Sequence, residues 1–324
     1  MTAAPQHNTV LQYIVVILIA VTINFLLPRL MPGNPLVVLA GVDVGLLTQE
    51  ERDEIIESAG LDRPLIVQYG DYLTDIAVGD FGYSYRQNRP ISDIIMERLP
   101  WTLLLAFSSL VISAIFGILL GAVSAWYRGS KLDLAMLNGM IATDSLPSFW
   151  IGMLFIAIFA VQLRWLPSQG AVTPASGLTG TAHIIDIIEH AVMPVATLSI
   201  LSIPRIYLTM RYTMIGLLGE DFIRTARAKG VGERGVLLNH MVPNALCPVV
   251  TVLAQRFGFA FGGTVVIETV FSYPGLGRLI FEAVSGRDYP VMQASFLLFT
   301  FAVLFSNILA DWLYPRLDPR VRHH

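Results

Sequence analysis

Three ionisable residues stand well inside long apolar runs of the sequence, where a charge needs a specific reason to be present. A fourth, Arg205, lies near the end of its run and can snorkel toward the interface. Asp144 lies in IATDSLPSFW beside Pro147, and Arg256 and Glu268 lie in the apolar stretch 245–270. A charged side chain within a membrane is costly, so each of these residues is a functional candidate by default. Asp144 could line the path of a substrate, or it could form an ion pair with Arg256 inside a helical bundle. The sequence leaves both possibilities open.

Polar residues near these charges extend the set of candidates into two groups. The first group would line a translocation pathway and comprises Asn138, Asp144, Ser145, Ser148, Gln255 and Arg256. The second group surrounds the segment ETVFSYPGLGR, where Glu268 and Arg278 are expected at the water interface. Its members are Glu268, Tyr273, Pro274, Gly275 and Arg278.

Motifs of enzyme chemistry are missing from the sequence. There is no G-x-x-x-x-G-K-[ST] phosphate loop, no H-E-x-x-H zinc helix and no G-x-S-x-G nucleophile elbow. The single cysteine, Cys247, excludes a disulfide within the chain and a cysteine-rich metal site. We therefore expect a non-enzyme with no catalytic residue, metal site or cofactor, whose energy source is handled by another chain.

The composition describes the elements that must position these residues. The chain of 324 residues is 54% hydrophobic and 14% charged, whereas a soluble protein carries roughly a quarter charged residues. Since about 20 apolar residues cross a bilayer as a helix, we predict an all-α polytopic membrane protein without a nucleic-acid footprint. Its six predicted spans are residues 10–27, 101–125, 134–163, 191–210, 245–270 and 291–310.

Lys and Arg residues in short loops set the orientation of a membrane protein. Basic residues follow the second, fourth and sixth predicted spans, so these loops and both termini are expected in the cytoplasm. The residues are Arg128, Lys131, Arg211, Arg224, Arg227, Lys229, Arg234, Arg316, Arg320 and Arg322. The resulting division is a first span in 1–30, an external domain in 31–98 and a five-helix core in 99–324, with a cytoplasmic loop at 219–246.

The external segment contains two predicted helices. Thr48 and Glu51 form a capping box that opens an acidic helix in TQEERDEIIESAG. The pattern of LIVQYGDYLTDIAVGDFG places Ile66, Tyr69, Leu73 and Ile76 on one helical face. The segment could be a compact cap on the membrane exit or a docking surface for another protein, and these two interpretations are compatible.

The cytoplasmic loop EDFIRTARAKGVGERGVLLNHMVPNAL predicts two short helices that meet at a glycine. Asp221 is expected to cap a helix over 222–229, and Gly230 is placed where a left-handed backbone costs glycine nothing. A second helix over 233–241 is expected to end at Pro243. Helices this short need a surface on which to pack. That surface could be a partner protein or the membrane.

This loop resembles the signature loop of permease subunits in ATP-binding-cassette (ABC) importers, which reads E-A-A, three residues, G, nine residues, then I-x-L-P. Ala226, Gly230 and Pro243 match that general pattern, and R-T-A-R-A-K-G is similar to the dipeptide, oligopeptide and nickel subgroup. Arg224 and Thr225 depart from E-A of the general pattern. Further segments resemble the first, B-type permease of the subgroup: LDRPL, GDFG, ERLPWTLLL, SLPSFWIG, ETVFSYPGLG and LDPRVR. Arg256 departs from the family, which has an uncharged polar residue there.

The resemblance implies the fold of a type I ABC importer permease in a bacterial or archaeal plasma membrane. It also implies four partner subunits: a second, similar permease, two ABC ATPase subunits that bind ATP and Mg²⁺, and an extracytoplasmic substrate-binding protein. The coupling residues that it implies are Asp221, Phe222, Arg224, Thr225, Ala226, Arg227, Lys229, Gly230 and Pro243. The YPGLG segment would form an external gate or meet the binding protein.

Short peptides are the substrate that the resemblance favours. Relatives with this organisation also import nickel, opines or oligosaccharides, which gives the alternative within the class. An ATP-independent secondary transporter or channel is the alternative from another class. It would show internal repeats with broken helices, and no convincing repeat is present. An intramembrane enzyme is disfavoured because no nucleophile and base are paired.

Overall fold

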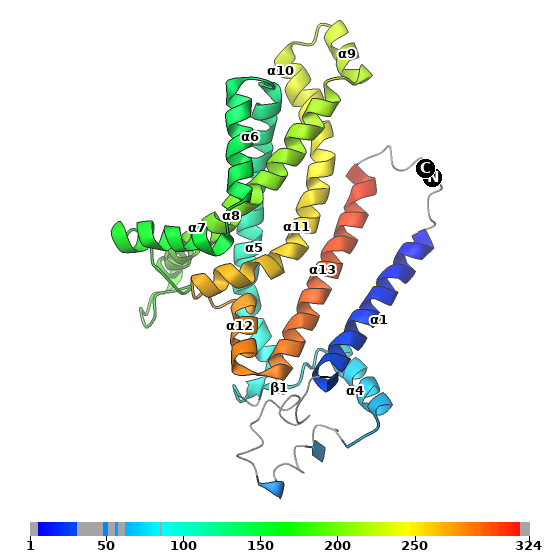
Figure 1. The fold of residues 1–324 in the computed structure, drawn as a ribbon, viewed down its shortest axis with the longest axis vertical. Helices are drawn as coiled ribbons and strands as arrows, with labels where there is room; N and C mark the ends of the chain where they lie inside the picture. The colour runs from blue at the N-terminus through cyan, green and yellow to red at the C-terminus, as the bar shows by residue number, and fades with distance from the viewer. Residues whose placement is uncertain (1–5, 31–47, 51–55, 58–61, 85, 318–324) are drawn as a thin grey trace. The chain divides into compact units, whose positions relative to one another are not determined.

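The computed structural model describes residues 6–30, 48–50, 56–57, 62–84 and 86–317 of the chain. These residues are almost entirely helical, as the composition predicts (Figure 1). They divide into two compact units, Met1–Thr102 with Pro274–Leu304 and Leu103–Tyr273 with Phe305–His324. The acidic helix predicted over 48–60, with Glu51 of its capping box, lies largely outside the described residues.

The first unit contains α1 (Gln6–Leu30), α4 (Leu65–Val78) and α12 (Leu276–Gly286), together with parts of α5 (Ile91–Trp126) and α13 (Tyr289–Leu317). A small antiparallel pair, β1 (Tyr83–Ser84) and β2 (Arg89–Pro90), places Tyr83 opposite Pro90. The start of α5, α12 and α13 share an apolar core. Its buried members include Ile91, Ile94, Leu276, Leu279 and Val291.

The predicted amphipathic helix in the external segment is confirmed as α4, which lies against α1. The ring of Tyr69 meets that of Phe25 edge-on at 5.1 Å between centroids, and its hydroxyl is 2.7 Å from Thr22 Oγ1. Leu73 is also half-buried, whereas Ile66 is 77% exposed. Ile66 belongs to the same helix but lies before the turn at which the contact with α1 begins.

The second unit contains α6 (Lys131–Asp144), α7 (Ser148–Phe155), the π-helical turn η2 (Ile156–Gln162), α8 (Gly180–Leu217) and α11 (Val242–Val270). The span predicted over 134–163 is not one continuous helix. The helix stops at Asp144 and resumes at Ser148, and the two parts are bent by 98°. Pro147 lacks a backbone N–H and restricts the residue before it to extended conformations, which accounts for the break.

Two glycines one turn apart on α5 allow α8 to approach closely. A Cβ on Gly117 would lie 2.7 Å from Ile206 Cβ, and one on Gly121 would lie 2.7 Å from the carbonyl oxygen of Tyr207. This spacing is the G-x-x-x-G pattern that membrane helices use where their backbones approach. Larger residues at either position would separate the two helices.

The described residues contain four helices that are long and apolar enough to cross a membrane, or five if the bent pair α6–α7 counts as one span. The four lie within α5, α8, residues 233–257 and α13. The apolar part of α1, Leu11–Leu26, is shorter than the length used for that count. Six complete spans are therefore not established by these helices.

Candidate functional site

The loop between α8 and α11 begins with a short helix, α9 (Asp221–Ala228), drawn beside the label α10 in Figure 1. Glu220 holds the N-cap position with extended backbone, so the prediction that Asp221 is the cap was wrong by one residue. Asp221 occupies the first helical turn instead, where its negative charge interacts favourably with the positive end of the helix dipole.

The apolar face of α9 packs on the protein itself. Ile223 and Ala226 are 0% and 5% exposed and join a core with Val236, Met241 and Ala245. Phe222 packs against the same core and is half-buried. The short helix therefore has the surface that it needs, and that surface belongs to its own chain. Ile223 was missed by the sequence reading, although it lies one turn before Ala226.

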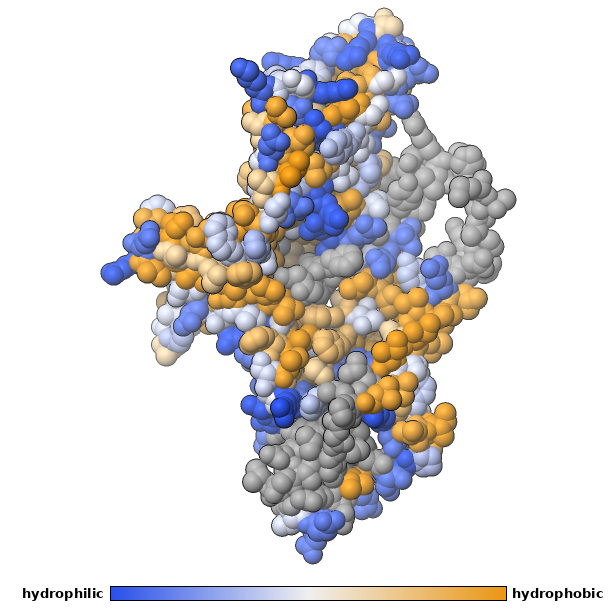
Figure 2. Space-filling view, in the orientation of Figure 1, coloured by the Kyte–Doolittle hydropathy of each residue, from blue (hydrophilic) through white to orange (hydrophobic). Residues whose placement is uncertain are grey.

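The opposite face of α9 is open to solvent. Arg224, Thr225, Arg227, Ala228 and Lys229 are all exposed. Figure 2 shows hydrophilic residues gathered over this end of the second unit. Arg227 makes two bonds to Glu233, at 2.9 and 3.1 Å, which tie α9 to the next helix. This polar face is thus available to a partner, whereas the apolar face is not.

Gly230 ends α9 in the manner that the sequence predicts. Its φ is +80°, in the left-handed region that disfavours other residues. The Gly230 N–H donates to Arg227 O at 2.9 Å and the Val231 N–H donates to Ala226 O at 3.2 Å. These two bonds form a Schellman motif, which satisfies carbonyls that the helix end would leave unpaired. A Cβ on Gly230 would meet no atom within 4 Å, so only backbone conformation constrains this position.

The second predicted helix does not end at Pro243. Helix α10 (Glu233–Gly235), the π-helical turn η3 (Val236–Met241) and α11 follow one another without a break. Proline in a helix removes one hydrogen bond and clashes with the carbonyl four residues earlier. The wider π-helical turn before Pro243 relieves that clash, and Asn244 Nδ2 donates to His240 O at 2.6 Å. The second arm of the loop is therefore the start of α11.

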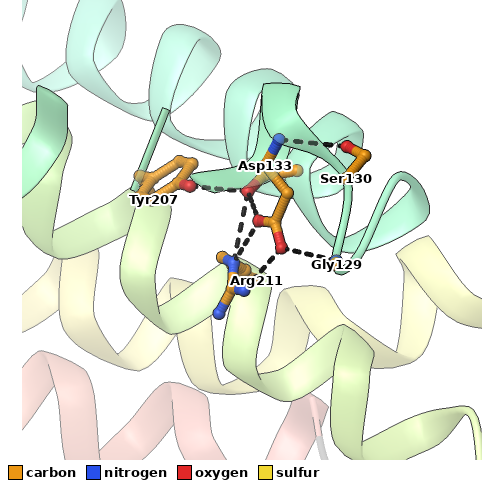
Figure 3. Close-up of polar contacts among 6 residues, drawn as sticks. Gly129, Ser130, Asp133, Tyr207 and Arg211 are labelled. Atoms are coloured by element: carbon orange, nitrogen blue, oxygen red, sulfur yellow. Dashed lines mark hydrogen bonds and ion pairs between the residues drawn. The ribbon is translucent and has the colours of Figure 1, made fainter. Parts of the chain in front are cut away.

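A buried polar network lies on α5, α6 and α8 next to the core that carries α9. Arg211 donates from Nε and Nη2 to the two carboxylate oxygens of Asp133, at 2.7 and 2.8 Å (Figure 3). Ser124 Oγ donates to Asp133 and lies 2.6 Å from the Tyr207 hydroxyl. The Gly129 N–H donates to the same carboxylate at 3.0 Å.

The sequence reading missed this network. It treated Arg211 as a loop cation, but the side chain is 10% exposed and that of Asp133 is 5% exposed. Asp133 also lies in the first turn of α6, where acidic residues are ordinary. Only its N-cap, Ser130, was readable from spacing, and the charged partner, Arg211, lies 78 residues away. No local pattern could have joined them.

A cavity of about 310 Å³ opens in the second unit. Residues of α5, α6, α7, α8 and α11 line it: Ala106, Ser109, Leu110, Asp144, Leu146, Ser148, Leu198, Leu201, Ser202, Arg256 and Thr264. Three of the six predicted pathway residues are thereby brought together, namely Asp144, Ser148 and Arg256. The other three, Asn138, Ser145 and Gln255, are exposed and do not line this cavity.

The charges in this cavity are not paired with each other. The Arg256 guanidinium donates to Ser202 Oγ at 3.4 Å, and within the described residues it forms no ion pair with Asp144. No salt bridge joins these two residues, but the charge of Asp144 acts electrostatically on Arg256, so their pairing stays a prediction. Ser109, Ser202 and Thr264 add hydroxyl groups that the sequence reading did not select.

The segment after α11 is more enclosed than predicted. Glu268 and Tyr273 are fully buried, and the Tyr273 N–H donates to Glu268 O at 2.7 Å. Burial raises the pKa of the Tyr273 phenol well above its usual range, and the charge of Glu268 adds to this effect. Glu268 is thus enclosed by the protein and not exposed to water, and its level relative to the membrane stays a prediction.

The remaining residues of that group lie at the start of α12. Gly275 is its N-cap and Pro274 precedes it. Arg278 is half-buried and donates from Nε to Glu282 at 2.7 Å, and Glu282 also accepts a looser contact from Arg98 at 3.6 Å. Arg278 is thus a member of a charged cluster within the first unit and not an isolated surface cation.

Comparison with known proteins gives a consistent result along the whole chain. Residues 117–323 match the family described as the binding-protein-dependent transport system inner membrane component, and residues 7–106 match its N-terminal domain. A protein named as a peptide transport system permease in Brucella abortus (strain 2308) is 38% identical over 97% of both chains. The glutathione transport system permease protein GsiC of Escherichia coli (strain K12) is 37% identical over 92% of both chains.

Solved structures share the fold. An inward-facing conformation of the MetNI methionine ABC transporter aligns with a TM-score of 0.57 at 16% identity, covering 69% of this chain and 96% of that one. An amino acid ABC transporter with histidines aligns with a TM-score of 0.51 at 15% identity, covering 69% and 94%. At these identities the likeness concerns the fold alone.

Proposed function

The chain belongs to the family of binding-protein-dependent transport system inner membrane components, and we propose that it forms the import pathway for short peptides. It is a permease subunit of an ABC importer and not itself an enzyme. The substrate class follows the names of the relatives, one a peptide permease and one a glutathione permease, because glutathione is itself a tripeptide.

The proposed topology has six spans. Five are the helices described above, with the bent pair α6–α7 counted as one, and α1 adds the span at the start of the chain. Residues 31–98 form an external domain, and both termini lie in the cytoplasm. The basic residues Arg128, Lys131, Arg224 and Lys229 support this orientation, since such residues favour cytoplasmic loops. Arg211 no longer contributes to that argument, because it is buried against Asp133.

The observation that carries the coupling role is the division of α9 into two faces. Its apolar face is fixed to the core of the second unit through Ile223 and Ala226, so a force on the helix reaches α8 and α11 directly. Its polar face, with Arg224, Thr225 and Arg227, is free for a partner. We propose that this face docks on one of two ABC ATPase subunits, which bind ATP and Mg²⁺.

The remaining partners are a second, similar permease and an extracytoplasmic binding protein that delivers the substrate. We propose that nucleotide binding to the ATPase pair draws the two coupling helices together and turns the cavity outward, and that hydrolysis resets it. Such a cycle requires a bundle with two stable arrangements, which ligand and nucleotide bias. The burial of Glu268 and Tyr273 supports a gate near this segment more than a free docking surface.

Uptake in a reconstituted complex tests the proposal. Proteoliposomes that contain both permeases and both ATPases, supplied with the binding protein, are expected to accumulate radiolabelled trialanine only when ATP is enclosed on the ATPase side. Disabling the ATP sites of the partner subunits should abolish this accumulation. Uptake that persists without functional ATP sites would contradict an importer and would favour a secondary transporter or channel.

A further inference from the structure

Two opposite charges face one cavity in the second unit without being paired. Asp144 at the end of α6 and Arg256 on α11 both line the cavity of about 310 Å³. Among the described residues, Arg256 has Ser202 Oγ as its one hydrogen-bond partner, at 3.4 Å. The Asp144 carboxylate has no protein hydrogen bond or ion pair in that part of the chain. A guanidinium has five N–H donors, so most of its bonding capacity remains open.

The same unit shows what a structural ion pair looks like in this protein. Asp133 and Arg211 make two short bonds, and Ser124 and the Gly129 N–H satisfy more of the carboxylate. Such pairing is what burial of charges ordinarily requires. Asp144 is exposed and Arg256 is half-buried, and no salt bridge joins them, although the charge of Asp144 acts electrostatically on Arg256. Most of their hydrogen-bonding groups therefore remain open to a ligand in the cavity that both line.

The lining indicates which chemistry would satisfy them. The planar fork of arginine matches a carboxylate in bidentate geometry. The charges of Arg205 and Asp144 both act electrostatically on Arg256, but only Asp144 lines the cavity with it. Asp144 offers only acceptors, which suit an ammonium group. The hydroxyl-bearing residues Ser109, Ser202 and Thr264 also line the cavity.

We propose that this cavity is a binding site for the zwitterionic main chain of a short peptide, with Arg256 taking the terminal carboxylate and Asp144 the terminal ammonium. This inference rests on the proposed function and adds a specificity to it: the permease selects for free termini. The cavity volume lies at the lower end of the range of roughly 300–1,000 Å³ for small-ligand pockets. A small ligand that is bound through its ends, with few side-chain contacts, fits that size.

Binding of capped and uncapped peptides to the purified complex without the binding protein tests the proposal. The probes are trialanine, its C-terminal amide and its N-acetyl form, each measured by equilibrium dialysis. The complex is embedded in vesicles of phosphatidylcholine and phosphatidylglycerol, which exclude an aminophospholipid headgroup as the occupant. Arg256→Gln should weaken binding of trialanine roughly 10- to 100-fold, the range of a charged hydrogen bond, and leave the amide unchanged. Asp144→Asn should weaken binding of trialanine by a similar factor and leave binding of its N-acetyl form unchanged.

Arg256→Lys serves as the second variant. It keeps the charge but loses the bidentate fork, so its preference for a free carboxylate should lie between those of the wild type and Arg256→Gln. Three results in a complex that imports trialanine would contradict this inference alone. The variants could lose binding of capped and uncapped peptides equally, neither variant could change binding, or the complex could fail to bind trialanine at millimolar concentration. If the wild-type complex drives ATP-dependent uptake of another solute and not of trialanine, the peptide assignment fails instead. Loss of trialanine binding on adding phosphatidylethanolamine to the vesicles would identify the lipid headgroup as the occupant and also overturn the proposal.

Discussion

Replacing Gly230 with valine is expected to lower the amount of solute imported per ATP hydrolysed roughly 5- to 30-fold. A non-glycine residue in the left-handed region costs about 1–2 kcal/mol, which corresponds to a factor of that size in an equilibrium. The Schellman bonds from Gly230 and Val231 depend on this backbone conformation. Their loss would let α9 leave its fixed orientation, so that ATP hydrolysis continues with less transport. The ratio of uptake to ATP hydrolysis in proteoliposomes measures this effect.

Gly230→Asn is the matched control, because asparagine tolerates the left-handed region better than valine does. It should retain most of the coupling. The open space around Gly230 means that the two side chains differ in backbone preference and not in clashes. Both variants should insert into the membrane normally, since the position lies outside the apolar spans. Equal coupling in Gly230→Val and the wild type would show that the conformation of this turn does not matter for transport.

Replacing Asp133 with asparagine is expected to destabilise the permease by about 3–5 kcal/mol, the usual effect of breaking a buried ion pair. The variant leaves the Arg211 guanidinium buried without its carboxylate, and the side chain is only 10% exposed. The network also includes Ser124 and Tyr207, so α5, α6 and α8 all lose a shared contact. The midpoint of thermal unfolding of the purified complex measures the loss.

The double variant Asp133→Leu with Arg211→Met separates two explanations of that result. Removing both charges together is often neutral or stabilising when apolar groups of similar volume replace them, so this variant should unfold near the wild-type midpoint. Asp221→Asn, which removes the partner of Arg224 in an exposed ion pair, should change the midpoint little. A midpoint for Asp133→Asn that equals the wild type would contradict the role given to this network.

Local patterns predicted the helices of this protein well, because each helix carries its own apolar length and end signals. Gly230 is an example: its position after an eight-residue helix is sufficient to predict the left-handed turn. The bend after Asp144 was not predicted, although Pro147 was visible, since proline inside a membrane helix can either kink or continue it. Pro243 shows the opposite outcome, and the π-helical turn before it could not be read from the sequence.

The functional site was predictable where a residue is unusual on its own. Asp144 and Arg256 stand out as charges in apolar runs, and both line the same cavity. Asp133 and Arg211 do not stand out, because each lies near the end of an apolar run, where charges are common. Their pairing depends on how α6 meets α8, which no spacing within either helix encodes. The full burial of Glu268 was not predicted either.

Cross-linking from α9 tests the central claim, that this helix couples the permease to an ATPase, most directly. In a cysteine-free background with Cys247→Ser, a benzophenone probe is attached at Thr225→Cys, on the exposed face of α9. The same probe is attached at Ile185→Cys, an exposed position near the opposite end of α8. Illumination of the intact complex should cross-link the probe at Thr225→Cys to an ATPase subunit, which mass spectrometry identifies. The probe at Ile185→Cys should give no such cross-link. A complex that imports its substrate but gives no ATPase adduct from Thr225→Cys would contradict the account.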